Sequence, residues 1–339
     1  MPTMRLYRLT RQPGGVKLTL TEAPIPEPGL GEVRVRIEAA SLNYRDLLVL
    51  DGAGRNGLDG RIPLSDGAGH VDTLGLGATR WHEGDRVAAS FFRDWHSGPF
   101  HPHYMASSLG GNATDGVLAE YIVLPEAALV TTPVHLSSAE AATLPCAAVT
   151  AWQALFARST LGREDTLLVQ GTGGVALFGL QFAKAIGARA IVLSSSDDKL
   201  ARAKAIGADI LINYRTTQDW DRAVLELTSG NGATHILELG GPDTYQRSIN
   251  AVAAGGKIAQ IGVLTGFGPK PDLARLQSVN ADILGITVGS RGHFEAMNGF
   301  IADHGLVPVI DRTFPFDATP AAYDYLRSGQ HFGKVVISL

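Results

Sequence analysis

The sequence predicts an α/β protein of two domains, one of them β-rich and discontinuous and the other a doubly wound parallel sheet. Three observations predict it. The opening part alternates apolar and polar residues between Gly/Pro-rich turns, the middle alternates short apolar runs with amphipathic segments, and the end returns to a strand, helix, strand pattern. At 339 residues the chain also exceeds the usual size of one core. We expect residues 1–137 and 306–339 to form the β-rich domain and residues 138–305 the inserted one.

The β-rich opening is clearest in GEVRVRIEAASLN, where Val33, Val35 and Ile37 take alternate positions, as in a half-buried strand. GDRVAAS and LAEYIVLP have the same character. Residues 92–116, which lie between these two runs, show no periodicity and are predicted to form a long loop. Long ordered loops are often functional, and Trp95, Phe100 and Tyr104 are candidates for the apolar lining of a site.

The helical middle begins near Ser137, where SSAEAATLPCAAVTAWQALF is rich in alanine and either Ser137 or Ser138 is available as an N-cap. Six short apolar runs follow, most of them separated by amphipathic segments. They are DTLLVQ, ARAIVLSS, ADILINY, THILELGG, GKIAQIGVL and ADILGITVGS. This alternation predicts strands of one parallel sheet with helical crossovers.

A glycine-rich turn joins the first of these strands to a helix in LLVQGTGGVALFGLQFAKAIGA. Gly171 permits a tight turn, Gly173 lets the backbone approach a pyrophosphate, and Ala176 allows close helix packing. An ordinary glycine-rich turn is the alternative, but the strand before and the helix after favour dinucleotide binding. The predicted contacts are Gly171, Thr172, Gly173, Gly174 and Val175.

The end of the next strand, LSSSDDKLARAK, indicates which dinucleotide is bound. Ser195 stands where an NAD-binding protein has an acidic residue, and Lys199 follows on the next helix. Hydroxyl groups and an ammonium suit a 2′-phosphate, and Tyr214 and Arg215 end the third strand nearby. We therefore predict NADP(H) in preference to NAD(H). The alternative gives the NAD role to Asp197 or Asp198, with Lys199 as a solvated residue.

Other cofactor contacts are expected where the remaining parallel strands end, because ligands bind beyond the carboxyl ends of such strands. The glycines there could instead be turn residues, and FGKVV also has the pattern of a closing strand. The predicted contacts are Gly240, Gly262, Val263, Val288, Ser290 and Lys334.

Two places in the sequence offer possible metal ligands. Cys146 is the only cysteine, and it could be a metal ligand, a nucleophile or a small core residue. His96, His101 and His103 lie together in the predicted loop and could hold zinc, copper or nickel. No fourth ligand accompanies them, so the sequence favours solvated histidines.

The motifs GDRV, DGVLAEYIVLP, LPCAAVTAW, the glycine turn, GADILINYR and HFGKVV occur in the order found in the medium-chain dehydrogenase/reductase superfamily. The chain resembles this superfamily over nearly its whole length, and most closely its zinc-free quinone oxidoreductase branch. The resemblance implies a GroES-like catalytic domain formed by the front and tail, a Rossmann domain, and a substrate site in the cleft between them.

The chain departs from the zinc-dependent members of that superfamily at the expected ligands. Asn43 stands where those enzymes have a cysteine, and Ser65 with Asp66 replaces their Gly-His-Glu run. A catalytic zinc site takes three protein ligands, which Cys146 and Asp66 do not complete. The structural zinc lobe is also ruled out, because it needs four cysteines. We therefore expect no bound metal and a Cys146 that is a small buried residue.

The same resemblance places NYRD and Thr150 beside the nicotinamide. Without a Lewis acid, neutral donors must stabilise the charge that forms on the hydride acceptor. Asn43, Tyr44 and Thr150 are the expected donors, with Asp46 orienting the loop. Asn43 and Asp46 could instead only cap a turn, and Tyr44 could be core. Weak polarisation favours a quinone or an α,β-unsaturated carbonyl as the substrate.

Two other functions fit the same cofactor: metal-free alcohol or aldehyde oxidoreduction, and a non-catalytic NADPH-binding redox sensor or structural protein. The net charge of −4 without a basic block gives no footprint for nucleic acid or an anionic membrane, and one cysteine allows no internal disulfide. No signal-like run and no apolar stretch of about 18 residues is present, so a cytoplasmic protein is expected. ADILGITVGS is predicted as an exposed edge strand, which favours a homodimer.

Overall fold

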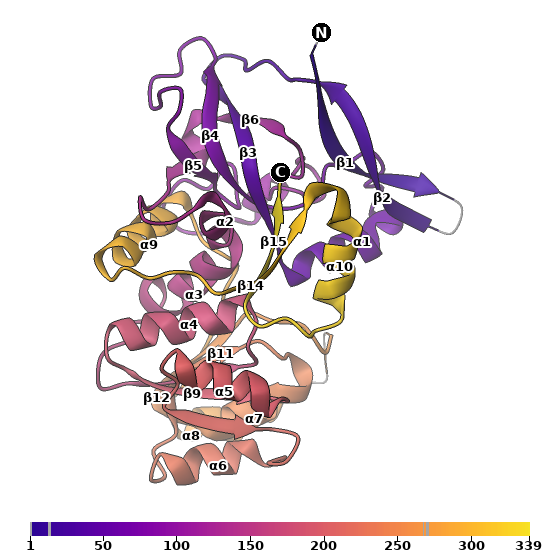
Figure 1. Cartoon of the computed structure of the whole chain (residues 1–339). Coiled ribbons are helices and arrows are strands. Elements are labelled where there is room, and N and C mark those ends of the chain that lie inside the picture. The colour runs from indigo at the N-terminus through magenta and orange to yellow at the C-terminus, as the bar shows by residue number, and fades with distance from the viewer. Residues whose placement is uncertain (1, 13–14, 267, 269–270) are drawn as a thin grey trace. The chain divides into compact units, whose positions relative to one another are not determined.

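The computed structural model describes residues 2–12, 15–266, 268 and 271–339 (Figure 1). The chain packs into two compact units. The first consists of Met1–Val149 with Gly289–Leu339, and the second of Thr150–Val288. Within the described ranges, no helix is both long enough and apolar enough to span a bilayer.

The first unit is built on antiparallel strands, as the alternating pattern predicts. A two-stranded sheet pairs β1 (Thr3–Gln12) with β2 (Gly15–Pro24). In the described residues a second, seven-stranded sheet has the order β14-β15-β3-β4-β5-β7, and β6 also pairs with β3. Its strands are β3 (Glu32–Leu42), β4 (Asp66–Leu74), β5 (Arg86–Ala89), β6 (Tyr121–Pro125), β7 (Leu129–Thr131), β14 (Ile310–Pro315) and β15 (Lys334–Ser338).

Strand β3 is the central strand of this sheet and shows why the sequence pattern predicts it. Val33, Val35 and Ile37 are all buried in one core, and the residues between them are more exposed. The last strand of the chain, β15, pairs antiparallel with β3 so that Val335 faces Leu42. The predicted return of the chain end to the β-rich domain is therefore confirmed, and it places Lys334 beside the end of β3.

Helical segments of the first unit cover its sheet and connect its strands. The helices are α1 (Tyr44–Asn56), α2 (Ser138–Ala141), α9 (Arg291–Asp303) and α10 (Thr319–Arg327), with 3₁₀ turns at Pro102–Ser107, Glu126–Ala128 and Phe316–Ala318 and a π-helical turn at Leu144–Ala148. Ser137 is the N-cap of α2, where its hydroxyl accepts from the Glu140 amide in a capping box.

The segment 92–116 is a loop with one 3₁₀ turn, and its aromatic residues pack on one another. Trp95 is 1% exposed, its ring stacks on Tyr104 at 5.8 Å between centroids, and Phe100 lies edge-on at 5.1 Å. The loop therefore has a small core of its own, and Trp95 is part of that core.

The second unit has the predicted parallel sheet. Its six strands in the described residues have the order β10-β9-β8-β11-β12-β13, and every pairing is parallel. They are β8 (Thr166–Gln170), β9 (Arg189–Ser194), β10 (Ile210–Asn213), β11 (Ala233–Glu238), β12 (Val252–Gln260) and β13 (Asp282–Gly285). The helices are α3 (Val149–Trp152), α4 (Gly174–Ala185), α5 (Asp197–Ala205), α6 (Trp220–Leu227), α7 (Pro242–Ala251) and α8 (Ala274–Ser278), with a π-helical turn at Gln153–Ala157. The strand order reverses between β8 and β11, which is where such sheets bind ligands.

The two units differ in extent from the predicted domains. Helix α2 packs on β3 and β4 of the first unit, so the first unit continues beyond residue 137. Helix α9 also belongs to the first unit: Asn298 donates to the Thr131 carbonyl at 2.8 Å, and Arg291 donates to the Ala127 carbonyl at 3.0 Å. Strand β13 ends at Gly285, earlier than the apolar run ADILGITVGS indicates.

A strained turn precedes β4 and is held by close glycine contacts. Leu64 is fully buried and has a φ of 70°, which branched and bulky residues adopt rarely. Gly116 passes so close that a Cβ there would stand 2.1 Å from the Leu64 carbonyl oxygen. Because the Val117 amide also donates to that oxygen at 3.0 Å, the turn is fixed from one side by the 116–117 backbone.

We expect Gly116→Ala to lower the free energy of unfolding by about 2–3 kcal/mol, because the added methyl group must displace backbone. Gly299→Ala is the matched control. It adds the same group to the exposed interior of α9, where a Cβ meets nothing within 4 Å, and should stabilise by about 0.5–1 kcal/mol. Urea denaturation of both variants checks the pair, and equal effects would contradict the close approach.

Candidate functional site

The glycine turn after β8 forms an open backbone cradle at the start of α4. Gly171 has a φ of 78°, and Gly173 is the N-cap of α4, which has no side-chain cap. A Cβ added at Gly171 or Gly173 would meet no atom within 4 Å. The first amides of α4 therefore lie beside unfilled space, with the positive end of the helix dipole. This arrangement fits the pyrophosphate of a dinucleotide, and Thr172, Gly174 and Val175 lie in the same turn.

A buried carboxylate holds the neighbouring loop after β11. Glu238 is fully buried, and its Oε1 accepts from the amides of Gly240 and Gly241 at 3.0 Å. Its Oε2 accepts from Gln170 at 2.7 Å, while the Gln170 oxygen accepts from the Gly240 amide at 3.0 Å. Two strand ends are thereby tied together. Gly240 was a predicted contact, whereas Glu238 and Gln170, the two side chains that hold it, were not predicted.

The loop after β12 approaches this loop closely. A Cβ at Gly262 would lie 1.9 Å from the Leu239 carbonyl oxygen, so only glycine fits. Gly262 donates its amide to the Glu238 carbonyl at 3.0 Å, and Val263 follows it. Gly240, Gly262 and Val263 thus lie at adjacent carboxyl ends of β11 and β12, as predicted from the topology.

The predicted adenosine end is built from β9 and β10. Asn213 is in register with Ser194, and the Tyr214 amide donates to the Ser194 carbonyl at 3.0 Å. Ser195, Tyr214 and Arg215 therefore leave the sheet at one edge, and Lys199 is in the first turn of α5. The Asp197 carboxylate accepts from the Asn213 side chain at 2.7 Å.

Val288 and Ser290 lie beyond the end of β13 rather than at it. Val288 has a φ of 49°, a strained value for a β-branched residue. Ser290 belongs to the first unit and caps α9: its hydroxyl accepts from the His293 amide at 3.2 Å, and its amide donates to His293 Nδ1 at 3.2 Å. The expectation that Val288 and Ser290 mark a strand end is therefore corrected, because the ladder with β12 stops at Gly285.

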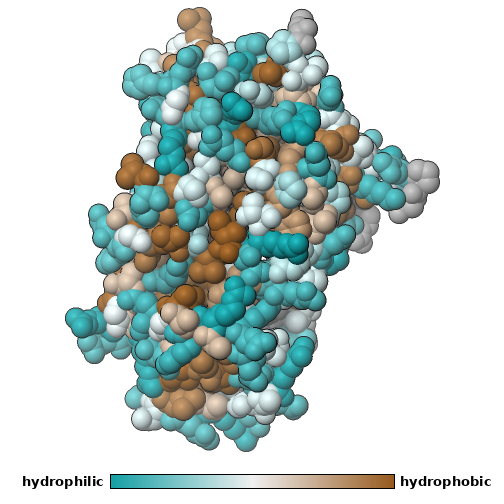
Figure 2. Space-filling model, viewed as in Figure 1, coloured by the Kyte–Doolittle hydropathy of each residue, from teal (hydrophilic) through white to brown (hydrophobic). Residues whose placement is uncertain are grey.

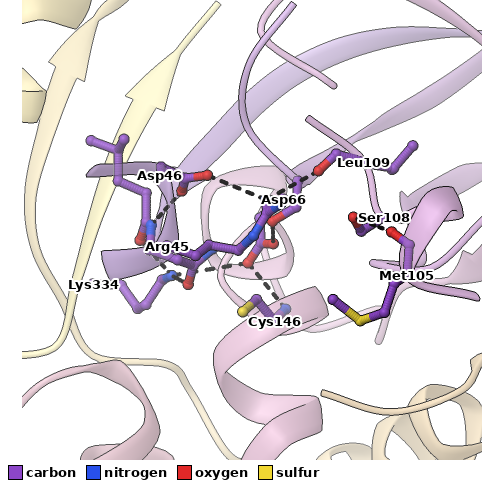
Figure 3. Close-up of polar contacts among 11 residues, drawn as sticks. Arg45, Asp46, Asp66, Met105, Ser108, Leu109, Cys146 and Lys334 are labelled. Atoms are coloured by element: carbon purple, nitrogen blue, oxygen red, sulfur yellow. Dashed lines mark hydrogen bonds and ion pairs between the residues drawn. The ribbon is translucent and has the colours of Figure 1, made fainter. Parts of the chain in front are cut away.

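A buried polar cluster lies in the first unit, around the ammonium of Lys334 (Figure 3). Lys334 is 3% exposed, and its Nζ donates to the Leu42 carbonyl at 2.7 Å and to Asn43 Oδ1 at 2.6 Å. Asp66 Oδ2 lies 3.9 Å from the same nitrogen. We call Asn43, Asp46, Asp66, Cys146 and Lys334 the Lys334 cluster. Lys334 was predicted as a cofactor contact, and the partners found for it here are all in the first unit.

Asp66 and Cys146 show which ion this cluster can hold. Asp66 is fully buried, its Oδ1 accepts from the Ser65 hydroxyl at 2.6 Å, and its Oδ2 accepts from the Cys146 amide at 3.1 Å. Cys146 is half-buried, not fully buried as expected, and desolvation of its thiol, and then the Asp66 charge, raise the pKa of that thiol. A zinc ion does not fit these donors, because the Asn43 side-chain oxygen is bound to Lys334 and the Lys334 ammonium already faces Asp66.

Within the ranges that the structure describes, no group of three or more His, Cys, Asp or Glu side chains is placed to hold a metal ion. This includes the loop histidines, where the rings of His101 and His103 stack on each other at 5.6 Å between centroids. His96 does not form a metal-binding group with His101 and His103 among the described residues.

Asn43 and Asp46 are joined at the start of α1. The Asn43 amide donates to Asp46 Oδ2 at 2.8 Å, as the capping interpretation expects. Asn43 is 9% exposed, and its Nδ2 is buried without a hydrogen-bond partner among the described residues. Burial raises the pKa of Asp46 from 3.8 to about 6, and the Arg45 guanidinium opposes this. The cluster thus contains one donor without a partner in the described residues and one carboxyl group with a pKa of about 6.

Of the other predicted donors, Tyr44 is 40% exposed on α1 and is not core, and Thr150 is buried in the second unit. Tyr323 on α10 was not predicted. Its hydroxyl is buried without a partner in the described part of the chain, and burial together with the Asp46 charge raises the pKa of Tyr323. A tyrosine in an amphipathic helix carries no sequence signal for this position.

Two family models match: the alcohol dehydrogenase GroES-like domain over residues 29–134 and the zinc-binding dehydrogenase domain over residues 174–303. The chain is 43% identical to a zinc-type alcohol dehydrogenase-like protein of Schizosaccharomyces pombe, over 91% of each chain. It is 28% identical to the chloroplastic quinone-oxidoreductase QR1 of Triphysaria versicolor, over 96% of this chain and 94% of that one.

Solved structures are similar over their full length. A crystal structure from Sinorhizobium meliloti 1021 shares 45% identity with a TM-score of 0.93, covering 100% of this chain and 99% of that one. The crystal structure of an NAD-dependent alcohol dehydrogenase shares 34% identity with a TM-score of 0.87, covering 99% of each chain.

The raised pKa of Asp46 predicts a pH dependence of stability. Between pH 3.8 and about 6 the folded chain holds a proton that the unfolded chain has lost, so stability falls as pH rises through this window. The total is about 3 kcal/mol. Asp46→Asn keeps an acceptor for the Asn43 amide and should abolish this component. Urea denaturation of both proteins at several pH values from 4 to 7 checks it, and parallel curves would contradict it.

Proposed function

The chain belongs to the medium-chain dehydrogenase/reductase superfamily of oxidoreductases, and on that premise we propose that it is a metal-free, NADPH-dependent reductase of quinones or α,β-unsaturated carbonyls. The observation that supports this proposal most directly is the Asn43 Nδ2 group, a buried donor without a partner in the described residues. An unsatisfied buried donor costs about 1–3 kcal/mol, so its retention points to an acceptor that the chain itself does not supply.

The chemistry follows from what such a donor stabilises. NADPH, when bound, supplies a hydride from its nicotinamide ring. Hydride addition leaves a negative oxygen on a quinone, or an enolate oxygen when the hydride adds to the β-carbon of an enone. Asn43 Nδ2 donates to that oxygen. A proton from solvent then completes the product, so one acceptor, one NADPH and one proton give one reduced acceptor and one NADP⁺.

The substrate class follows from the strength of the donors. Saturated ketones and alcohols need stronger polarisation of their oxygen, by a Lewis acid or an acidic donor, and the Lys334 cluster does not fit a zinc ion. Asn43 offers a neutral donor, and the Cys146 thiol is kept protonated by burial. Quinones and enones accept hydride with this weaker assistance, which supports them as substrates.

The preference for NADPH rests on charge at the edge of β9 and β10. No carboxylate occupies the end of β9, and Asp197 is engaged by Asn213 at 2.7 Å, so it is turned to the third strand. Arg215 and Lys199 offer positive charge to a 2′-phosphate. We propose Gly171, Thr172, Gly173, Gly174, Val175, Ser195, Lys199, Tyr214, Arg215, Gly240, Gly262, Val263, Val288 and Ser290 as cofactor contacts.

A second candidate is alcohol or aldehyde oxidoreduction. It is favoured by the names of two relatives, the zinc-type alcohol dehydrogenase-like protein and the NAD-dependent alcohol dehydrogenase. A chain that binds NADPH tightly but reduces nothing would instead be a redox sensor.

The test measures NADPH oxidation by protein dialysed against EDTA, with 1,4-benzoquinone or 2-cyclohexen-1-one as acceptor and cyclohexanone as the matched saturated control. We expect turnover with one of the first two acceptors and none with cyclohexanone. We expect kcat/KM for NADPH to exceed that for NADH by about tenfold or more. Arg215→Met should remove most of that preference while leaving the NADH value within about threefold.

Three results would each overturn part of this proposal. Activity that disappears on chelation and returns with zinc would contradict the metal-free mechanism. An alcohol that reduces NADP⁺ while quinones and enones are inert would support the second candidate. Equal use of both cofactors would contradict the 2′-phosphate assignment.

We also propose that the protein forms a homodimer through β13. This strand ends the six-stranded sheet, and its outer edge has no strand partner in the described part of the chain. Ile283 on it is 40% exposed. Pairing of two such edges would cover both. Light scattering should give twice the chain mass of 35.8 kDa, and a mass of one chain at all concentrations would contradict the dimer.

A further inference from the structure

The ammonium of Lys334 is buried and held by three oxygen atoms. Lysine is among the residues least often fully buried, yet Lys334 is 3% exposed. Its Nζ donates to the Leu42 carbonyl at 2.7 Å and to Asn43 Oδ1 at 2.6 Å, and faces the buried Asp66 carboxylate at 3.9 Å. Every partner of the ammonium is thus an oxygen at the end of β3 or the start of β4.

These contacts determine the orientation of the Asn43 carboxamide. An ammonium has three donors and no acceptor, so the amide must turn its oxygen toward Lys334. Its Nδ2 then points away from Lys334. The backbone of Asn43 is held independently, because its amide donates to Asp46 Oδ2 at 2.8 Å and its carbonyl accepts from the Asp46 amide at 2.9 Å. The side chain therefore has one orientation, and the unpartnered Nδ2 has one direction.

The carboxylate of Asp66 makes the buried ammonium possible. Asp66 is satisfied by the Ser65 hydroxyl and the Cys146 amide, at 2.6 and 3.1 Å, and needs no hydrogen bond from Lys334. It offsets the charge of the ammonium at 3.9 Å while leaving its donors to Leu42 and Asn43. The two charges together have the effect of orienting a neutral amide.

We infer that Lys334 is a positioning residue, which acts on the reaction by fixing the Asn43 carboxamide so that Nδ2 faces the oxygen of the bound acceptor. This inference rests on the proposed function. Lys334 itself contacts no substrate atom. Its ammonium acts through an amide donor instead of binding the acceptor oxygen directly.

Without the Lys334 ammonium, we expect the Asn43 carboxamide to turn over. In Lys334→Met the Leu42 carbonyl loses its donor, and the Asn43 amide satisfies it by turning Nδ2 inward. A carbonyl oxygen then faces the acceptor and repels the developing charge. We expect kcat to fall about 100-fold, as for the loss of one oxyanion donor, with KM for NADPH within about threefold of wild type. Lys334→Arg, which keeps the charge and the donors, should recover most of the activity.

A double-mutant cycle separates positioning from a direct role. Asn43→Asp keeps a partner for Lys334 but replaces the donor by an oxygen, and should lower kcat about 100-fold. If Lys334 acts only through Asn43, the double variant loses no more than Asn43→Asp alone. A product of the two losses, about 10⁴-fold, would overturn the inference. Lys257→Met, which removes a lysine from an exposed pair with Asp282, is the matched control.

Two further measurements keep the test decisive. Because Lys334→Met leaves Asp66 without its counter-charge, Lys334→Met/Asp66→Asn is made in parallel and thermal unfolding of each protein is recorded. The amide orientation is read without turnover from the Asn43 side-chain resonance in ¹⁵N-asparagine-labelled protein, assigned by its loss in Asn43→Asp. We expect this resonance to shift and become protected from exchange in Lys334→Met and in Lys334→Met/Asp66→Asn.

The two readouts also separate the inference from the proposed function. If wild type reduces neither acceptor, the proposed function fails while the resonance still tests the orientation of Asn43. An Asn43 resonance identical in wild type and Lys334→Met/Asp66→Asn would overturn the positioning role, whatever the activity.

Discussion

The pairing of β15 with β3 is the interaction on which the polar site of the first unit depends. It sets Val335 opposite Leu42, and so brings Lys334 to the point where β3 ends and α1 begins. The contacts of the Lys334 ammonium follow from this register: Nζ meets the Leu42 carbonyl and the Asn43 side-chain oxygen, and Asp66 at the start of the neighbouring strand β4 balances its charge. A slip of one residue would turn Lys334 to the other face of the sheet.

The second unit has an open glycine turn and a loop held by a buried carboxylate. Its cradle must leave backbone amides open, so the turn after β8 has glycines where a Cβ would enter unfilled space. The neighbouring loop after β11 is held by the buried Glu238 carboxylate, which accepts hydrogen bonds from the amides of Gly240 and Gly241. In the first unit the Lys334 ammonium orients the Asn43 side chain, whereas in the second the Glu238 carboxylate holds the loop at Gly240 and Gly241.

Much of the fold could be predicted from the sequence because short sequence patterns indicate many of its elements. The alternation of Val33, Val35 and Ile37, the cap at Ser137 and the glycine turn at Gly171 each need only a short stretch of chain to be read. The end of β13 was misplaced because ITVGS is apolar enough for a strand, although its ladder with β12 stops at Gly285. The limits of the units were misplaced because α2 and α9 belong to the first unit by packing, which no local pattern reports.

The candidate site was only partly predictable, for a related reason. Asn43 and Asp46 could be identified in NYRD, and their hydrogen bond is local. Lys334 appears in FGKVV as a charge at the start of a strand, and nothing nearby indicates that its partners lie about 290 residues earlier in the chain. The unpaired hydroxyl of Tyr323 and the raised pKa of Asp46 likewise depend on burial, which is a property of the folded unit.

The late position of β15 in the chain has a consequence for biosynthesis. The parallel sheet is contiguous and can fold as soon as its residues have been synthesised, but the edge of β3 along Ala39–Leu42 stays unpaired until β15 emerges. During that interval the nascent chain carries an open strand edge and an Asp66 without its cation, both of which favour contact with chaperones or with other chains. Emergence of β15 closes the edge and assembles the contacts of Lys334 in one event, so a product truncated before β15 lacks both.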